Sequence, residues 1–431
     1  MSLLKTLANH RFTRQAGRIF LYLALSRLVT VAGNAWATRC LGPEKLGISG
    51  MIAATAGQMA LFVTCSLDIL FIRRYKEAAT EEEREGWIEL ATSQRFFFSL
   101  ILGLAGLVVA WFLHPPSDWW LGIIAALPMF VFLSIQPVWV NIAQEDLPAN
   151  FKASSISAVF VAGLYIIFFR HGQATGSDVV VQALQMALLY VMLSRAALKR
   201  VWPLPIHWRK VREFWPILRE GRWLFVSGLL IYIYVNLEVP MLGYLSSLVE
   251  LGKYKVATNL VNSTQQVLGL VPMLLYPRFV EWRKQGADVL WRKQLQLTAI
   301  FLVLGLPVSV LGFLLSPFVF RVLYGAAFVS AAIPFAVLFA SKVVVVLNGL
   351  FSFGLWAQSE DRKVFWVVLP TAIISFISNF LLLPRYGMAA ACCVNLLSEV
   401  LVFAGCFVLA RRHLKDVLAK AALTEPSSTP I

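Results

Sequence analysis

The sequence predicts an all-α membrane protein that crosses the bilayer about twelve times, with both chain ends in the cytoplasm. Two observations support this fold class: long apolar segments recur along the whole chain, and the number of positive charges between them alternates from loop to loop. A helix needs about 20 apolar residues to cross the hydrocarbon core. Only helices or closed barrels satisfy the backbone in lipid. Barrel strands are about half as long and alternate in polarity, so segments of this length indicate helices.

The predicted spans divide evenly between two halves of the chain. The first six cover 17–38, 48–72, 94–113, 119–143, 150–170 and 179–198. The second six cover 223–245, 254–277, 294–316, 329–356, 363–384 and 387–410. The basic stretch between the halves is rich in Trp and Arg, which is typical of a helix in the membrane interface. We therefore expect four parts: a six-helix bundle over 1–198, an interfacial linker over 199–222, a second six-helix bundle over 223–411, and a disordered cytoplasmic tail over 412–431.

The distribution of positive charge sets the expected orientation. With the N-terminus inside, 29 of the 38 Lys and Arg residues fall in cytoplasmic segments and only seven in outer segments. Cytoplasmic loops are enriched in Lys and Arg, so both ends are expected inside. The formal net charge of +15 is then mostly a topology signal, and it does not indicate a nucleic-acid partner.

Several classes of chemistry lack their sequence signals. The outer loops are short, which argues against a membrane glycosyltransferase, polymerase or ligase. No glycine-rich phosphate loop precedes a helix with Lys-Ser/Thr, so ATP use is not expected. The five cysteines and five histidines show no metal-ligand spacing, so we expect neither a metal site nor a cofactor. These absences favour a transporter over an enzyme.

Four short stretches resemble the polysaccharide and O-antigen flippases of the multidrug/oligosaccharidyl-lipid/polysaccharide (MOP) exporter superfamily. They are ATRCLGPEKLG at 37–47, LGKYKVA at 251–257 running on to PMLLYP at 272–277, SPFVFRVLYGAAF at 316–328, and LLLPRYGMAAA at 381–391. The resemblance covers most of 15–410. It implies two six-helix bundles that form a V around a central cavity. It also implies movement of an undecaprenyl-diphosphate-linked saccharide from the inner to the outer leaflet of a bacterial inner membrane, for export of O-antigen, capsule or another surface polysaccharide. A polymerase and a chain-length regulator of the same pathway are possible partners.

Three other functions stay open at this stage. Within the same superfamily, the chain could be a drug/cation antiporter, whose cavity should be dominated by acidic residues. From a different class, it could be a non-transporting membrane subunit of a polysaccharide assembly machine. An integral membrane glycosyltransferase is the enzyme alternative, which the short outer loops disfavour.

Two cations within spans are the first candidates for substrate binding. A flippase must provide fixed cations for the diphosphate, and an Arg or Lys at mid-bilayer costs about 2.5–3.5 kcal/mol. Arg27 lies halfway along the first span, and Thr30 and Asn34 share its helical face. Lys342 lies near the middle of the tenth span. The alternative for both cations is a structural pairing with a carboxylate of a neighbouring helix.

Polar stripes on two further spans are candidates for binding sugar hydroxyls. The seventh span carries Tyr232 and Asn236, and the eighth carries Asn259, Asn262 and Gln266 on one face. Amides and aromatic hydroxyls suit sugars, but the same groups also form interhelical hydrogen bonds worth about 0.6 kcal/mol each.

Three intramembrane carboxylates are candidates for coupling transport to a proton or Na⁺ gradient: Asp68, Glu238 and Glu399. A coupling carboxylate must bind a proton or a cation inside the bundle. Asp68 and Glu399 could equally pair with Arg27 or Lys342, which would make them structural.

Overall fold

The computed structural model describes residues 10–144, 146–170, 172–197, 206–268, 270–358 and 361–424. In these residues the chain is mostly helical and has no strand, and the described part of each of the twelve predicted spans lies mainly on helix. Short breaks at 65–67 and 135–137 interrupt the second and the fourth predicted spans. Within the described residues, eight helical ranges are long and apolar enough to cross a membrane. Two of them, Ser26–Thr64 and Lys363–Val417, each cover parts of two predicted spans. The all-α fold class is confirmed.

Two long helical ranges each contain one glycine with non-helical backbone angles, which divides the range into two helices. Helix α2 (His10–Thr64) is broken at Gly42, which has φ 76° and ψ 172°, and Pro43 begins the second half. Helix α16 (Asp361–Thr424) is broken at Gly387, which has φ 51°. Positive φ favours glycine because it has no Cβ. These breaks separate the first span from the second and the eleventh from the twelfth.

Contacts divide the chain into two compact units. Unit 1 comprises Met1–Leu229, Leu248–Lys255 and Leu323–Ala327, and unit 2 comprises Leu230–Ser247, Val256–Val322 and Phe328–Ile431. Two short segments from the second half of the chain therefore belong to unit 1.

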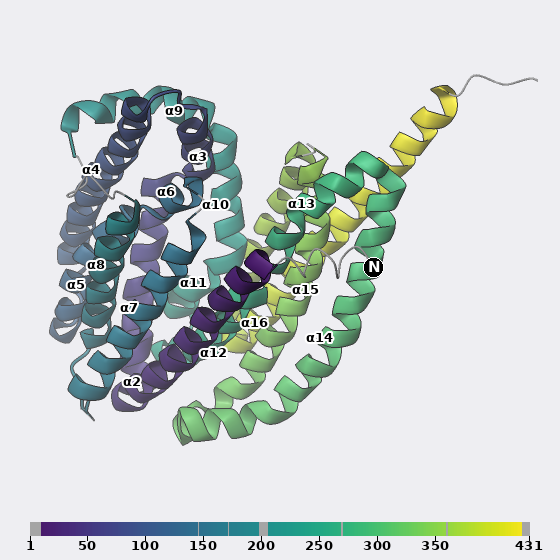
Figure 1. Cartoon of the computed structure of the whole chain (residues 1–431). Coiled ribbons are helices and arrows are strands. Elements are labelled where there is room, and N and C mark those ends of the chain that lie inside the picture. Colours follow the sequence, from purple (N-terminus) through teal and green to yellow (C-terminus); the bar gives the residue numbers. More distant parts are fainter. Residues whose placement is uncertain are drawn as a thin grey trace, which may run out of the picture. The chain divides into compact units, whose positions relative to one another are not determined.

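Unit 1 is a bundle of packed helices. Its remaining elements are α3 (Asp68–Glu77), α4 (Glu81–Leu113), η1 (Ser117–Trp119), α5 (Trp120–Ser134), α6 (Val138–Ala143), α7 (Leu147–Phe168), α8 (Ser177–Ala197), η2 (Trp208–Glu213) and α9 (Phe214–Glu220). Helix α2 packs against α5 and α7, and α5 packs against α4 and α8. In Figure 1 α4, α5 and α8 lie side by side.

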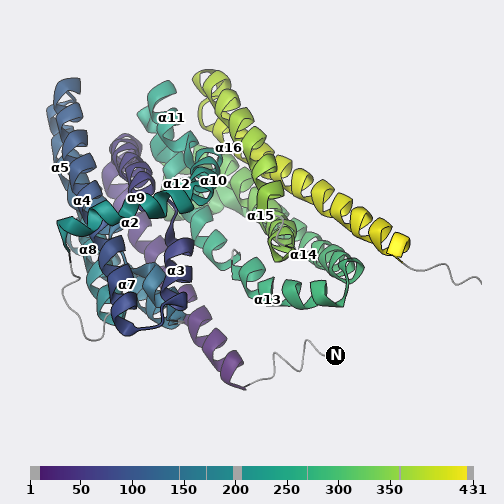
Figure 2. The same cartoon turned by 90° about the horizontal axis from the view of Figure 1, so that it is seen from above.

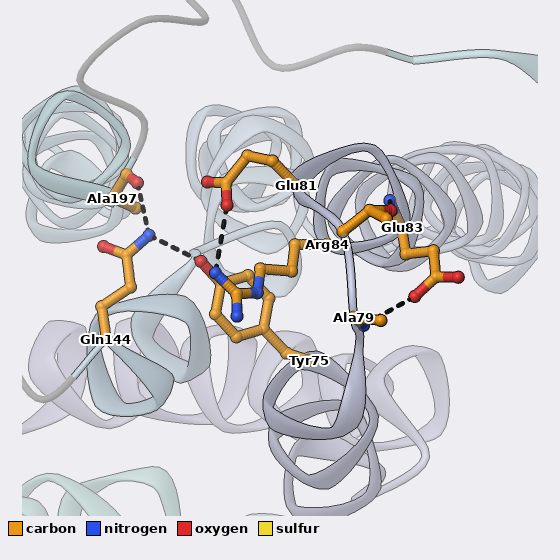
Figure 3. A network of polar contacts seen from close by, with 8 residues as sticks. Tyr75, Ala79, Glu81, Glu83, Arg84, Gln144 and Ala197 are labelled. Carbon is orange, nitrogen blue, oxygen red and sulfur yellow. Dashed lines mark hydrogen bonds and ion pairs between the residues drawn. The ribbon is translucent and has the colours of Figure 1, made fainter.

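The acidic run before the third span caps a helix. Thr80 accepts a hydrogen bond from the backbone N–H of Glu83, and the Glu83 carboxylate accepts from Ala79 N–H at 2.8 Å (Figure 3). Glu81 pairs with Arg84, which lies over the Tyr75 ring. Carboxylates in the first turn also interact favourably with the positive end of the helix dipole. The acidic residues thus stabilise the start of α4.

The described part of the linker, η2 and α9, is docked onto unit 1. Phe214 is fully buried and meets Phe98 edge-on, and Trp208 meets Phe97 edge-on. Glu220 accepts two hydrogen bonds of 2.8 Å from Arg74 of α3. Trp208 and Trp215 are exposed, and the position of this linker in the membrane interface stays a prediction. Figure 2 shows α9 running across the ends of unit-1 helices.

Unit 2 is built around α15 (Ala332–Ala357), which packs against α16. Its other elements are α11 (Glu238–Leu245), α13 (Leu270–Gln285), nearly all of α14 (Ala287–Leu323), the later part of η3 (Ala326–Ala331), the part of α10 (Arg222–Asn236) from Leu230 on, and the part of α12 (Leu248–Leu268) that follows Lys255. The seventh predicted span consists of two shorter helices, α10 and α11, which are separated at Leu237. The described residues of the eighth predicted span lie on α12 and α13. Interrupted helices of this kind place polar groups inside transporters.

Candidate functional site

A buried polar cluster occupies the interior of unit 2. Lys342, Glu238 and Glu399 are exposed by only 6%, 4% and 4%. The ammonium of Lys342 interacts electrostatically with both carboxylates, more strongly with Glu399. The structure therefore brings together the second candidate cation and two candidate coupling residues.

Three helices supply this cluster, and each places its residue for a local reason. Lys342 lies near the middle of α15 and is the one charged residue of that helix. Glu238 begins α11, directly after the interruption that follows α10. Asn395 and Glu399 are one turn apart on the second half of α16, so both side chains lie on the same face.

Neutral side chains complete the cluster. Asn395 donates to Glu238 at 3.1 Å, and Ser341 donates to Asn395 at 3.4 Å. Asn348 donates to Glu399 at 3.3 Å, while its own Oδ1 is buried and finds no donor among the described residues. Buried carboxylates require such donors, since an unpaired buried charge is costly.

Arg27 lies in unit 1 and differs from Lys342 in its surroundings. It is half-buried in α2, and its Nε is buried without a hydrogen-bond acceptor among the described residues. Thr30 uses its hydroxyl to donate to the Ser26 carbonyl of the same helix, and Asn34 is half-buried. An Arg without an internal acceptor is free to bind an anionic ligand through its fork of N–H groups.

The polar stripes are placed as follows. Tyr232 and Asn236 are half-buried on α10, and Asn259 and Asn262 are exposed on α12. The Gln266 side chain lies outside the described part of the structure. None of the four described side chains is buried, and their proposed contact with sugar remains a prediction.

Asp68 has a partner that the sequence analysis did not consider. It forms an ion pair with Arg95 of α4, whose side chain is only 4% exposed whereas that of Asp68 is 51% exposed. Arg95 also lies over the Phe71 ring at 5.7 Å. This pair ties α3 to α4 and supports a structural role for Asp68 within unit 1.

Sequence reasoning missed a second buried ionic cluster, in unit 1. Asp178 at the start of α8 accepts from Lys255 at 2.9 Å and from Gln182 at 2.7 Å, and it also accepts from the Tyr165 hydroxyl. The Lys255 stem passes over Gly50, where an added Cβ would lie 2.8 Å from Lys255 Cδ. The sequence offered one signal for this pair: Asp178 and Lys255 carry opposite charges, and both lie at the outer end of a predicted span.

Neither cluster has the donors of a metal centre. Within the described residues no group of three or more His, Cys, Asp or Glu side chains could hold a metal ion. The arrangement is suited to binding and moving charge through a low-dielectric interior.

Comparisons with known proteins identify the family. Residues 14–282 match the family described as "Polysaccharide biosynthesis protein". The chain belongs to this family. The "Putative O-antigen transporter" of Escherichia coli (strain K12) is 24% identical over 378 residues, which are 84% of this chain and 88% of that protein.

Solved structures of MOP transporters share the fold. The lipid II flippase MurJ in an inward closed conformation has a TM-score of 0.73 at 12% identity, covering 95% of this chain and 93% of that chain. An inward-facing multidrug resistance MATE family transporter of the MOP superfamily has a TM-score of 0.62 at 15% identity, covering 95% and 100%. The expected resemblance to this superfamily is confirmed. This member of the polysaccharide biosynthesis protein family is a multi-pass membrane transporter.

Proposed function

We propose that the chain is a flippase that moves an undecaprenyl-diphosphate-linked oligosaccharide from the cytoplasmic to the outer leaflet of a bacterial inner membrane by alternating access. The Escherichia coli relative is named for O-antigen transport, and the structure with a TM-score of 0.73 is that of a lipid II flippase. Both names point to a lipid-linked saccharide. A polymerase and a chain-length regulator would then act on the product in the outer leaflet.

The buried, unpartnered Nε of Arg27 is the observation that carries this proposal. A diphosphate headgroup needs a cation that is held in the membrane and not already neutralised. Arg27 meets both conditions, because it lies in an apolar span and no described group accepts from its Nε. The planar guanidinium can also donate two parallel hydrogen bonds to one phosphate group.

Replacement of Arg27 tests the proposal. A hydrogen bond to a charged group contributes about 1.5–3 kcal/mol, so Arg27→Ala should slow flipping of labelled lipid-linked saccharide in vesicles by about 10- to 150-fold. Arg27→Lys should retain part of the rate, because the charge remains while the fork is lost. Arg321→Ala removes an exposed cation at the end of α14 and serves as the matched control. Full activity of Arg27→Ala, with normal membrane abundance, would refute the cationic role.

A drug/cation antiporter is the second candidate, because Glu238 and Glu399 are buried carboxylates and a MATE transporter shares the fold. The two functions predict opposite substrate charge. Drug efflux by cells that carry this chain, together with unchanged surface polysaccharide on its deletion, would favour the antiporter. Loss of surface polysaccharide with no drug sensitivity would favour the flippase.

The energy source is also a proposal. With Glu238 and Glu399 buried together, a proton or Na⁺ gradient could act on unit 2 as that unit changes its exposure. Removal of the product by polymerisation is the alternative that needs no ion.

A further inference from the structure

The linker segment formed by η2 and α9 contacts α4 where the third predicted span begins. The backbone N–H of His207 donates to Ser93 Oγ at 2.9 Å. The rings of Trp208 and Phe97 meet edge-on, with their centroids 4.8 Å apart. Ser93 and Phe97 stand at the predicted cytoplasmic end of the span over 94–113. Lipid headgroups flank the hydrocarbon core at this depth, so η2 is expected at the level of the headgroups.

A second contact gives the same depth for the end of α9. Glu220 accepts a hydrogen bond of 2.8 Å from Arg74 of α3. Gly221 lies so close to Leu67 that an added Cβ would be 2.2 Å from Leu67 Cδ2. Leu67 and Arg74 lie on either side of Ile72, where the second predicted span ends in the cytoplasm. Both ends of the linker segment are therefore expected in the cytoplasmic headgroup region.

Helix α9 has one packed face and one open face. Phe214 and Ile217 are buried in a hydrophobic core cluster of unit 1. Trp215 and Arg219 are one helical turn apart on the opposite face, and both are exposed. An exposed Trp beside a cation, on a helix at headgroup depth, is typical of a helix that also contacts lipid.

The carboxylates of the linker segment are already paired. Between 206 and 220 the chain has two acidic residues, Glu213 and Glu220. Glu213 pairs with Lys210 at 3.2 Å, and Glu220 pairs with Arg74 at 2.8 Å. Neither carboxylate is left to neutralise the other cations of the segment.

Three arginines and two tryptophans form a surface that we call the linker face: Arg209, Arg212 and Arg219 with Trp208 and Trp215. All five side chains are exposed, and none of the three arginines forms an ion pair among the described residues. Guanidinium groups bind phosphate through charge-assisted hydrogen bonds, and basic residues on an amphipathic helix are attracted to anionic lipids. A soluble anion would gain nothing from the indole rings, which prefer the boundary between headgroups and acyl chains. The linker face therefore fits a lipid better than a free anion.

We propose that the linker face binds anionic phospholipids of the cytoplasmic leaflet, with its arginines on the headgroup phosphates and its tryptophans at the start of the acyl chains. The inference concerns unit 1 alone and does not depend on which substrate is transported. It assigns a ligand to side chains that the candidate substrate site does not use.

Thermal unfolding of the purified protein in mixed micelles tests the proposal. Phosphatidylglycerol is titrated into micelles that contain phosphatidylcholine, and the mole fraction that gives half of the rise in unfolding temperature is recorded. The parent should be stabilised by phosphatidylglycerol, because a ligand of the folded state raises its stability. Each cation near an anionic surface contributes about fivefold in affinity. Arg209→Gln/Arg212→Gln/Arg219→Gln should therefore need at least about tenfold more phosphatidylglycerol or show no rise.

The matched control is Arg411→Gln/Arg412→Gln/Lys415→Gln, which removes three exposed cations from the predicted cytoplasmic end of α16 and should respond like the parent. Trp215→Ser should weaken the response to phosphatidylglycerol and leave the unfolding temperature in phosphatidylcholine unchanged, since its ring is 63% exposed. Inorganic phosphate added to phosphatidylcholine micelles should not stabilise the parent.

Three results would overturn the proposal. They are an equal unfolding temperature of the parent with and without phosphatidylglycerol, an equal loss of the response in the linker and α16 triple variants, and stabilisation of the parent by inorganic phosphate. The first and the third need only the parent, so they decide the matter even if a variant does not fold. No readout involves transport, so this inference can fail while the proposed flippase function stands, and the reverse.

Discussion

The ion pair between Asp178 and Lys255 is expected to determine the stability of unit 1. Lys255→Met keeps the apolar stem over Gly50 and removes only the ammonium. The side chains of Lys255 and Asp178 are 13% and 6% exposed, so the loss leaves a buried carboxylate. Breaking a buried pair costs about 3–5 kcal/mol. Tyr165 and Gln182 still donate to Asp178, which places the expected cost near the lower end.

A cost of about 3 kcal/mol corresponds to a decrease of roughly 6–12 °C in the unfolding temperature of a unit of this size. Thermal unfolding followed by size-exclusion chromatography in detergent measures it. Lys253→Met is the matched control, because it removes a half-buried cation two residues away on the same helix. Asp178→Asn/Lys255→Met should be more stable than the sum of the single effects by at least about 1 kcal/mol. Equal unfolding temperatures for Lys255→Met and Lys253→Met, with additive double-variant effects, would refute the reasoning.

Two further predictions concern unit 1. Gly252→Ala should lower the unfolding temperature, because the added Cβ would lie 1.8 Å from the Pro43 carbonyl oxygen and overpacking costs about 1–3 kcal/mol. Gly86→Ala is the control: its added Cβ meets nothing within 4 Å, so this variant should be neutral or stabilising. Asp68→Asn should lower the unfolding temperature by about 2–4 °C, since Asp68 is half exposed, and should leave the pH and Na⁺ dependence of transport unchanged. If Asp68→Asn altered the pH or Na⁺ dependence of transport, the structural role of Asp68 would be wrong and a role in ion coupling would be supported.

The positions of the spans could be predicted because hydropathy is a local property of the chain. The described part of each of the twelve predicted segments lies mainly on helix, and Gly42 and Gly387 separate the two pairs that are continuous. The interruption before Glu238 could not be predicted in the same way. The break lies at Leu237, between Asn236 and Glu238. Single polar residues also occur inside uninterrupted predicted spans, so the hydropathy of 223–245 alone does not show where the helix stops.

Partners of the charged residues could be predicted only where few choices existed. Glu399 was expected to meet either Arg27 or Lys342, and the structure shows its interaction with Lys342. Asp68 was given the same two choices, but it pairs with Arg95, which the charge count had assigned to a cytoplasmic segment. Asp178 and Lys255 are 77 positions apart, and no sequence period connects them. Pairing depends on packing, which a single sequence does not encode locally.

The two intramembrane cations, equivalent in the sequence, thus differ in the structure. Lys342 could bind a diphosphate only by weakening its interaction with Glu238 and Glu399, and this loss would offset part of the free energy gained from the phosphate. Arg27 has no described acceptor at its Nε, so an incoming phosphate gains the full charge-assisted interaction. The substitutions should therefore separate. Arg27→Ala should slow flipping and leave the unfolding temperature nearly unchanged, whereas Lys342→Met should lower the unfolding temperature, because two buried carboxylates lose the ammonium with which they interact. If both variants slowed flipping equally and neither lowered the unfolding temperature, the two cations would share one role and the distinction drawn from their surroundings would be wrong.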